Sequence, residues 1–524
     1  MLCFKSFKKF TLLLAAFFSI FAAPLLGKEL RIGVQAITSS LDPHYHNTGT
    51  NNQVTRHVFD KLVERDENQQ PAPGLAESWR AIDDLTWEFK LRKGVQWQDG
   101  SAFTADDVVF TFDRAPDVEN SPGSFAQYLK GKKVIKVNDL IVNIKTEKPY
   151  PLMPNDLMTF GIISKKHGQG AKTEDYNSKK ALVGTGPYQV EEFRFGDRVV
   201  LKANPLYWGT KPMWDRVIMK VYKSGPSRVA ALLSGDVDLI EHVPTTDIER
   251  LKNDSNITLS EGASARLIYM HLDRWQENSK EFTDKATGQP LGNNPFNDLR
   301  VRQAFSFAIS REAIGSRIMD DLSIPAGQIV PEGLFGYDPS LKAWPYDPKK
   351  AKDLMVEAGY ADGFGIVVHA PNNRYVNDYK IAEAIAQMLT RIGIKVSVET
   401  EPKTTYFKNA WNYSFLLAGW GSNSGEASSA LRAIVSTQDK KKGTGTNNRG
   451  RYSNTEVDQA IEQALATIDD TDRLHLLQKA TRIAVEDVAI IPVHFQKGVW
   501  AAKKGLYYKT RVDQHTIATG VYTK

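Results

Sequence analysis

One short segment, residues 182–190, constrains the fold of this chain more than any other part of its sequence. It reads LVGTGPYQV, so Gly184, Gly186 and Pro187 come directly before an alternating pattern that begins at Tyr188. Glycine tolerates positive φ and proline fixes φ near about −65°, so the segment predicts a tight turn into a β-strand. It lacks the Lys-Ser/Thr pair of a phosphate-binding loop, which excludes that kind of nucleotide site here.

Two further motifs flank this turn at long range. The first is WEFKLRKGVQWQDG at residues 87–100, continued by FTADDVVF at 103–110, and the second is FNDLRVRQAF at 296–305. In this order, the three motifs resemble the extracytoplasmic solute-binding proteins of peptide-type ABC importers, which include oligopeptide-, dipeptide-, glutathione- and nickel-binding proteins. The resemblance covers nearly the whole chain from Glu29 onward. It implies an α/β, bilobal periplasmic binding protein of the large three-domain type, with a hinge and an interlobe cleft.

The 524 residues exceed one domain by a wide margin. We expect lobe I to comprise residues 28–69, 183–290 and 497–524, with an accessory domain at 70–182 inserted in it, and lobe II to comprise 291–496. No Pro/Ser-rich linker separates these units, so we expect crossing strands to join the lobes, with the tail returning to lobe I. Such a connection suits a hinge. Alternating helical and Val/Ile-rich strand patterns predict a mostly parallel sheet in lobe II.

The N-terminal segment has the features of a secretory signal peptide, predicted at residues 1–27. Three lysines precede an apolar run at residues 10–21, and Ala22 and Ala23 follow it. The run is too short for a permanent membrane anchor. Cleavage is expected between residues 22 and 28, with a cut after Gly27 favoured. The only cysteine, Cys3, lies in this segment and too early for lipid attachment. The mature protein is therefore predicted to be periplasmic, free of disulfides and not a lipoprotein.

Composition excludes one large class of partner. Removal of the three signal lysines lowers the formal charge from +6 to +3, which is too mild for a nucleic-acid-binding protein. The densest basic run, residues 440–442, borders a Gly/Thr/Asn loop and is predicted to be solvated.

No set of residues typical of a catalytic site is present. The sequence has no Gly-x-Ser-x-Gly motif, and the mature chain offers no cysteine nucleophile. The segment GQGAKT at 168–173 has Ala171 where a phosphate loop needs glycine. We therefore predict a carrier that is not an enzyme and needs no cofactor. A periplasmic hydrolase is the alternative from another class.

The loop that follows the strand at 413–418 is the main candidate for ligand contact, through Trp420, Ser422, Asn423 and Glu426. In amine-binding members of the resembling family, this loop carries an aspartate that pairs with the ligand α-ammonium, and Asn423 occupies that position here. Asparagine supplies no charge, and a buried unpaired ammonium is costly. The resemblance therefore implies a peptide or peptide-like solute that is N-blocked or glutathione-like.

Further candidate contacts are aromatic and arginine side chains near predicted strand ends. Arg374 follows a strand and precedes a helix, where open α/β sheets bind ligands, and it could form a bidentate pair with a carboxylate. The set comprises Tyr45, Arg266, Tyr269, Arg374, Tyr375 and Trp500.

The alternative within the same family is a nickel- or metal-chelate-binding protein. His44 and His46 form the only close histidine pair, and His494 and His515 lie near the end of the chain. In either case the resemblance implies a monomer that delivers its ligand to an inner-membrane ABC permease with cytoplasmic ATPases.

Overall fold

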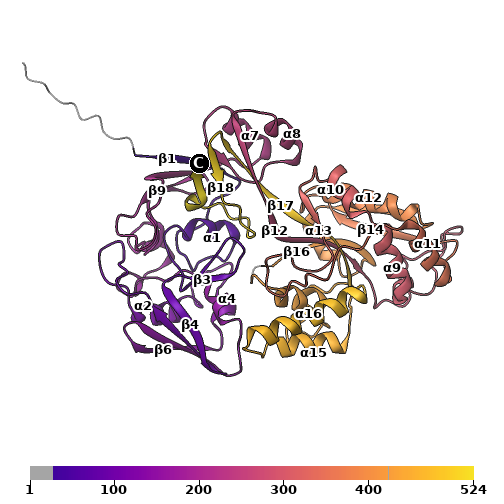
Figure 1. Ribbon diagram of the computed structural model, residues 1–524, viewed down its shortest axis with the longest axis horizontal. Coiled ribbons are helices and arrows are strands. Elements are labelled where there is room, and N and C mark those ends of the chain that lie inside the picture. Colours follow the sequence, from indigo (N-terminus) through magenta and orange to yellow (C-terminus); the bar gives the residue numbers. More distant parts are fainter. Residues whose placement is uncertain (1–26, 423) are drawn as a thin grey trace, which may run out of the picture.

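The computed structural model describes residues 27–422 and 424–524, which form two lobes joined through one eleven-stranded mixed sheet (Figure 1). Its strands run in the order β15, β14, β16, β12, β17, β11, β1, β10, β9 and β8, and β13 pairs with β17. The α/β bilobal prediction is confirmed. The predicted signal peptide lies outside the described residues, except for Gly27. The strands are β1 (Glu29–Val34), β8 (Tyr188–Arg194), β9 (Arg198–Ala203), β10 (Arg216–Val221), β11 (Leu239–Ile240), β12 (Ile257–Leu272), β13 (Ser323–Pro325), β14 (Gly365–Pro371), β15 (Lys395–Glu401), β16 (Phe415–Gly421) and β17 (Ile490–Lys503).

Strands β12 and β17 carry the chain between the lobes. They pair with each other antiparallel along most of their length, with register shifts at Ala263–Leu267 and Ile268–Tyr269. Such shifts bend and twist a strand, and these lie where β12 leaves the first lobe. Strand β17 pairs with β12 along both lobes and with β11 of the first lobe, so the strand pairing agrees with crossing strands and a tail that returns to the first lobe.

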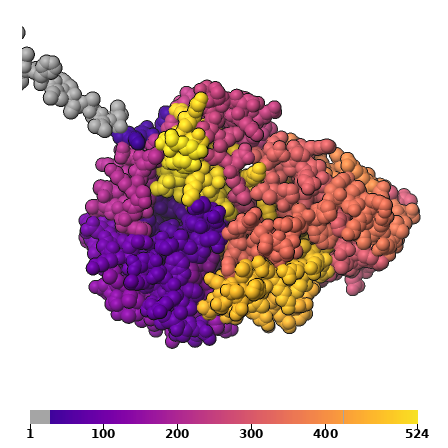
Figure 2. All heavy atoms as spheres, viewed as in Figure 1, coloured from indigo at the N-terminus to yellow at the C-terminus, as the bar shows by residue number. Residues whose placement is uncertain are grey.

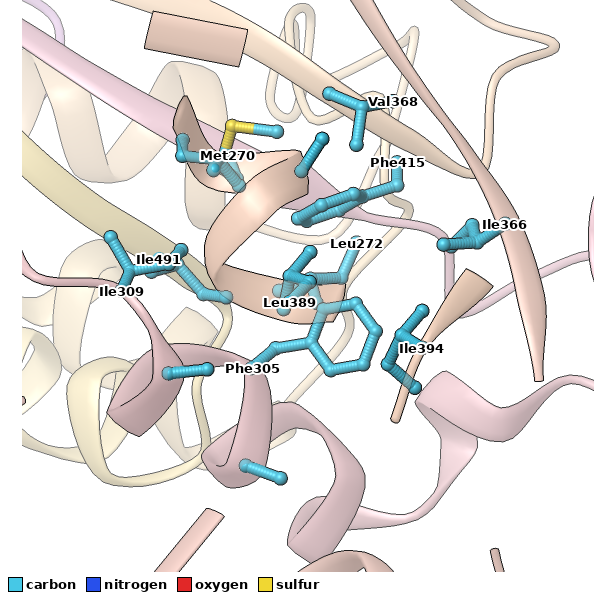
Figure 3. Close-up of a cluster of buried hydrophobic side chains, with 14 of the residues drawn as sticks. Met270, Leu272, Phe305, Ile309, Ile366, Val368, Leu389, Ile394, Phe415 and Ile491 are labelled. Carbon is cyan, nitrogen blue, oxygen red and sulfur yellow. The ribbon is translucent and has the colours of Figure 1, made fainter. Parts of the chain in front are cut away.

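The chain enters the second lobe within β12. Met270 and Leu272 lie in the second-lobe core (Figure 3), and Phe282 packs in the same core. The end of β12 also pairs with β16 of that lobe. Residues 266–290 therefore lie with lobe II, which corrects the predicted first-lobe boundary at residue 290.

The turn at residues 182–190 holds the first lobe against the accessory domain. The N–H of Gly186 donates to the Val58 carbonyl at 2.9 Å, and Gln98 of the first motif accepts from the N–H of Gly184 at 3.2 Å. A Cβ at Gly184 would lie 1.8 Å from the Val58 carbonyl oxygen. Neither glycine has positive φ. The predicted tight turn is thus present, but close backbone approach, and not φ, requires the glycines.

The accessory domain is an antiparallel sheet in the order β4, β5, β7, β6, covered by short helices (Figure 1). Helix α2 begins after Thr104, whose N–H donates to Asp107 at 2.9 Å as the capping pattern predicts. Ile163, Tyr176 and Leu182 pack in the first-lobe core, so the accessory core ends before the predicted boundary at 182. The elements are β2 (Val63–Arg65), β3 (Pro71–Pro73), β4 (Ala76–Asp83), β5 (Thr86–Leu91), β6 (Lys132–Asn138), β7 (Ile141–Thr146), α2 (Ala105–Arg114), α3 (Ala126–Leu129) and α4 (Met153–Leu157).

The remaining elements complete the two lobes. The first lobe adds α1 (Gly49–Thr55), α5 (Lys165–Gly168), α6 (Thr173–Asn177), α7 (Gly225–Leu233), α8 (Ile248–Lys252), β18 (Leu506–Tyr508) and β19 (Val521–Thr523). The second adds α9 (Leu299–Ala308), α10 (Arg311–Arg317), α11 (Pro348–Glu357), α12 (Asp378–Thr390), α13 (Lys403–Asn409), α14 (Ala427–Ala430), α15 (Thr455–Ala464) and α16 (Asp470–Glu486). In this lobe β14 is parallel to β15 and β16, whereas β12 runs antiparallel to β16, so the sheet is mixed. Within residues 27–422 and 424–524, no helix combines the length and apolarity that crossing a bilayer requires.

Candidate ligand-binding site between the lobes

The two lobes touch on both sides of the crossing strands. Asn155 and Gln70 donate side-chain N–H groups to the carbonyls of Ser424 and Gly425, at 2.7 and 3.0 Å. Asn377 at the start of α12 lies 3.4 Å from the Thr245 hydroxyl of the first lobe. Figure 2 shows the indigo N-terminal part in contact with the orange and yellow second lobe. The two lobes therefore contact each other at these points.

Two parallel strands, β14 and β16, end at this interface. Arg374 and Tyr375 follow β14, and their N–H groups donate to Asp378 at 2.9 and 3.0 Å, which fixes the loop at the start of α12. The Tyr375 hydroxyl accepts from the N–H of Gly419 at 2.9 Å. A Cβ at Gly419 would lie 2.7 Å from the Tyr375 ring, so glycine permits this contact. Carboxyl ends of parallel strands are where open α/β sheets bind ligands.

Three arginines influence the ionisation of Tyr375, and we call Arg266, Arg374 and Arg449 the arginine cluster. The Arg374 guanidinium lies over the Tyr375 ring at 5.1 Å, and Arg266 pairs with Gly421 at the end of β16. Burial raises the pKa of Tyr375, and all three arginines oppose that rise. Burial, followed by the neighbouring Arg374, lowers the pKa of Arg266. Arg449 lies over the Phe407 ring at 5.3 Å.

No described carboxylate forms an ion pair with any member of the arginine cluster. Arg374 is exposed, but Arg266 and Arg449 are half-buried, and cations that are partly removed from water are costly unless an anion approaches them. Arginine binds carboxylates through two parallel N–H groups. The cluster is therefore chemically suited to an acidic group of a ligand.

The loop after β16 has a rigid base. Glu426 is fully buried and pairs with Arg473 of α16 and with Ser428. The hydroxyl of Ser422 donates to the Glu426 carbonyl at 2.9 Å. Glu426 was predicted to contact ligand, but its carboxylate is used to hold the loop. Asn423 lies outside the described residues.

Two buried polar atoms, one at the end of β16 and one in the loop that follows it, lack a partner among the described residues. Neither the Trp420 indole N–H nor the Ser424 hydroxyl has a hydrogen-bond partner among the residues that the structure describes. Native proteins seldom leave such groups unpaired, so both atoms are available to a ligand or to water.

Three other predicted contacts lie elsewhere. Tyr269 is buried in a second-lobe core, and Trp500 lies in the first-lobe core with its indole N–H donating to Thr516 at 2.8 Å. Core packing leaves neither ring free for a ligand. Tyr45 lines a cavity of about 990 Å³ that is bounded by first-lobe and accessory residues such as Arg114 and Lys172. This cavity does not lie between the lobes.

Comparison with protein families decides the identity of the fold. A model described as bacterial extracellular solute-binding proteins, family 5 Middle, matches residues 70–442. The chain belongs to this family. The resemblance inferred from the three motifs is confirmed, and with it the prediction of a substrate-binding component of an ABC importer.

Individual family members cover nearly the whole chain. The dipeptide-binding protein of Escherichia coli K12 is 28% identical over 498 residues, 89% of each chain. Glutathione-binding protein GsiB of Escherichia coli O1:K1 is 28% identical over 495 residues, 91% of each chain. The solved structure of HbpA2 from Haemophilus parasuis superposes with a TM-score of 0.81 at 25% identity, and covers 95% of this chain and 100% of its own.

The histidines of the metal alternative do not gather. His44 is buried, with Nε2 2.8 Å from the Gly161 carbonyl and Nδ1 3.1 Å from Arg114. His494 lies in a strand interior, and His46 and His515 have other neighbours. Across the described ranges, no group of three or more His, Cys, Asp or Glu side chains is arranged to hold a metal ion.

These buried histidines predict acid sensitivity. Burial lowers the pKa of His44 and His57 to about 4, and that of His494 and His515 to about 3. The unfolded chain binds protons below about pH 6.5, whereas the folded chain stays neutral there. Stability should therefore be complete above about pH 6.5 and fall as the pH drops toward 4, by up to about 3 kcal/mol per histidine.

Urea unfolding at pH 7.5, 6.0 and 5.0 measures this loss. His494→Met should reduce the dependence on pH. Ile491→Val, on the same strand, should lower stability equally at each pH, because it removes no titrating group. An unchanged pH dependence in His494→Met would contradict the assignment.

Several residues at the interface were not predicted. Arg449 follows the polar segment GTGTNN at 443–448, which reads as a solvated loop. Gln70 and Asn155 lie in the accessory domain, and only their contacts with the second lobe mark them. The only sequence feature that could have marked Arg449 as a candidate contact is the short basic segment Arg449-Gly450-Arg451.

Proposed function

We propose that this protein is a periplasmic carrier that captures a peptide-like solute through a free carboxylate and delivers it to an inner-membrane ABC permease. The arginine cluster carries this proposal, because none of its three cations forms an ion pair with a described acid. Relatives named for dipeptide and glutathione binding agree with a carboxylate-bearing ligand. The protein acts as a monomer and makes or breaks no bond in the ligand.

Closure explains how such a carrier signals that it is loaded. A ligand that contacts both lobes stabilises the closed form, because only closure surrounds it from both sides. The amide side chains of Gln70 and Asn155 already bind the loop after β16 in this structure, at Gly425 and Ser424. The surface of the closed form is the one that we expect the permease to recognise.

Arg266→Gln tests the proposal. The variant should bind the ligand about 10- to 100-fold more weakly, since a charge-assisted hydrogen bond contributes roughly 1.5–3 kcal/mol. Native mass spectrometry of protein purified gently from periplasm measures the occupied fraction and the mass that denaturation releases. Arg250→Gln, at an exposed arginine of α8, is the matched control. A released metal ion or chelate, or equal occupancy in Arg266→Gln and wild type, would overturn the proposal.

A further inference from the structure

A second group of cations lies on the first-lobe side of the interface. Arg511 pairs with Asp513 at 2.7 Å and donates to the carbonyls of Arg65 and Asp66 at 3.2 and 2.9 Å. Arg56 lies 3.6 Å from Asp513. These contacts hold Arg56, Arg65 and Arg511 together, and we call them the first-lobe arginines.

Arg65 is the member without a partner. It forms no ion pair with the described acids, and its Nε is buried with no hydrogen-bond acceptor among the described residues. Burial is the largest influence on the pKa of the Arg65 guanidinium, and burial lowers that pKa. A side chain in this state is poised to receive an anion.

The surrounding charges leave this region positive. Three arginines face two carboxylates, those of Asp513 and Glu64, which lie 3.6 Å from Arg56. Burial lowers the pKa of the Lys61 amine well below its usual value, so Lys61 adds little charge, and its Nζ donates to the Met158 carbonyl at 2.6 Å. Burial raises the pKa of Asp60 to about 7, so this acid offers little compensating charge.

A continuous run of backbone hydrogen bonds connects this region to the second-lobe site. The N–H of Val512 donates to the Glu67 carbonyl at 2.8 Å, and that of Ala265 donates to the Val512 carbonyl at 3.1 Å. The N–H of Ser422 donates to the Ala265 carbonyl at 3.4 Å. The first-lobe arginines therefore lie beside the residue that precedes Arg266 and beside the loop that follows β16.

We infer that the ligand carries two acidic groups, carboxylate or phosphate, with one bound by the arginine cluster and the other by Arg65. This inference rests on the proposed function and specifies the substrate class of that site. Closure brings two positive surfaces together, which costs free energy in the empty protein. A dianion that bridges the lobes removes this repulsion, so it favours closure, whereas a ligand with one acidic group leaves Arg65 unpaired.

Inorganic sulfate serves as a probe that does not depend on the natural ligand. The melting temperature is compared in sodium sulfate and in sodium chloride of equal ionic strength, and the difference is the sulfate increment. We expect Arg65→Gln and Arg266→Gln each to lose roughly half of the wild-type increment and the double variant to lose nearly all of it. General salting effects are common to all variants and cancel in this comparison.

Two controls separate charge from structure. Arg65→Lys keeps the positive charge and should keep most of the increment, while Lys440→Gln, at an exposed loop lysine, should leave it unchanged. Circular dichroism confirms that each variant is folded. A wild-type increment in Arg65→Gln would overturn the inference. Loss in Arg266→Gln alone would retain the proposed function, and loss in Arg65→Gln alone would instead contradict the role of Arg266.

Discussion

Replacing Arg473 with leucine is expected to lower the free energy of unfolding by about 3–5 kcal/mol, which is the cost of leaving a buried charge without its partner. Arg473 pairs with Glu426, which is fully buried behind the loop that meets the first lobe. In Arg473→Leu the Glu426 carboxylate keeps only the Ser428 hydroxyl. The variant should also weaken ligand binding, because the loop that follows Trp420 and β16 loses its support.

A double-mutant cycle measured by urea unfolding isolates the pair. Glu426→Leu should lower the free energy of unfolding less than Arg473→Leu does, because Arg473 retains its ion pair with Asp470 at 3.0 Å. The double variant should be more stable than the sum of the single changes implies, since no unpaired charge is left. Additive losses would contradict a coupled pair.

Replacing Gly184 with alanine is expected to have the second large effect, a loss of more than about 4 kcal/mol or failure to yield soluble protein. The added Cβ would lie 1.8 Å from the Val58 carbonyl oxygen. Neither atom can move aside by a side-chain rotation, because the Cβ is fixed to the main chain and the oxygen belongs to it. Relieving this clash would move the turn away from Val58 and would break the hydrogen bonds from Gly186 to Val58 and from Gln98 to Tyr188. The accessory domain would lose its attachment to the first lobe.

Thermal and urea unfolding measure this effect against a glycine with space around it. A Cβ at Gly49, the first residue of α1, would meet only His515 at 3.7 Å, which is an ordinary contact. Gly49→Ala should therefore retain stability near that of wild type. Equal stability of the two variants would show that the Val58 contact is not required.

The sequence allowed the architecture to be predicted because its motifs lie at structural junctions. The turn near Gly184 and the Gln98 motif meet in space, although 85 residues separate them. The boundary at residue 290 could not be derived, because β12 reads as a continuous strand whether one lobe or two lie along it. Only the pairing of its end with β16 shows where the second lobe begins.

The positions of candidate contact residues could be predicted where strand ends determine them, and could not where loops do. Arg374 and Tyr375 follow β14 directly, so their place was visible in the pattern of strand and helix. Arg449 lies over the Phe407 and Trp411 rings from a loop about 40 residues further along the chain, and no periodicity in the sequence indicates such an approach. Trp500 shows the converse limit, because an aromatic residue in a strand gives the same pattern in a core as at a binding surface.

The path of β17 also sets the order in which the protein can be completed during synthesis. The first lobe begins at β1, yet its core includes Trp500, Tyr508 and Val521 from the end of the chain. Strand β11 obtains one of its two neighbours only when β17 is present. The lobe that emerges first from the ribosome is therefore the last to be finished, so the growing chain stays without a complete N-terminal domain until nearly all of it has been made.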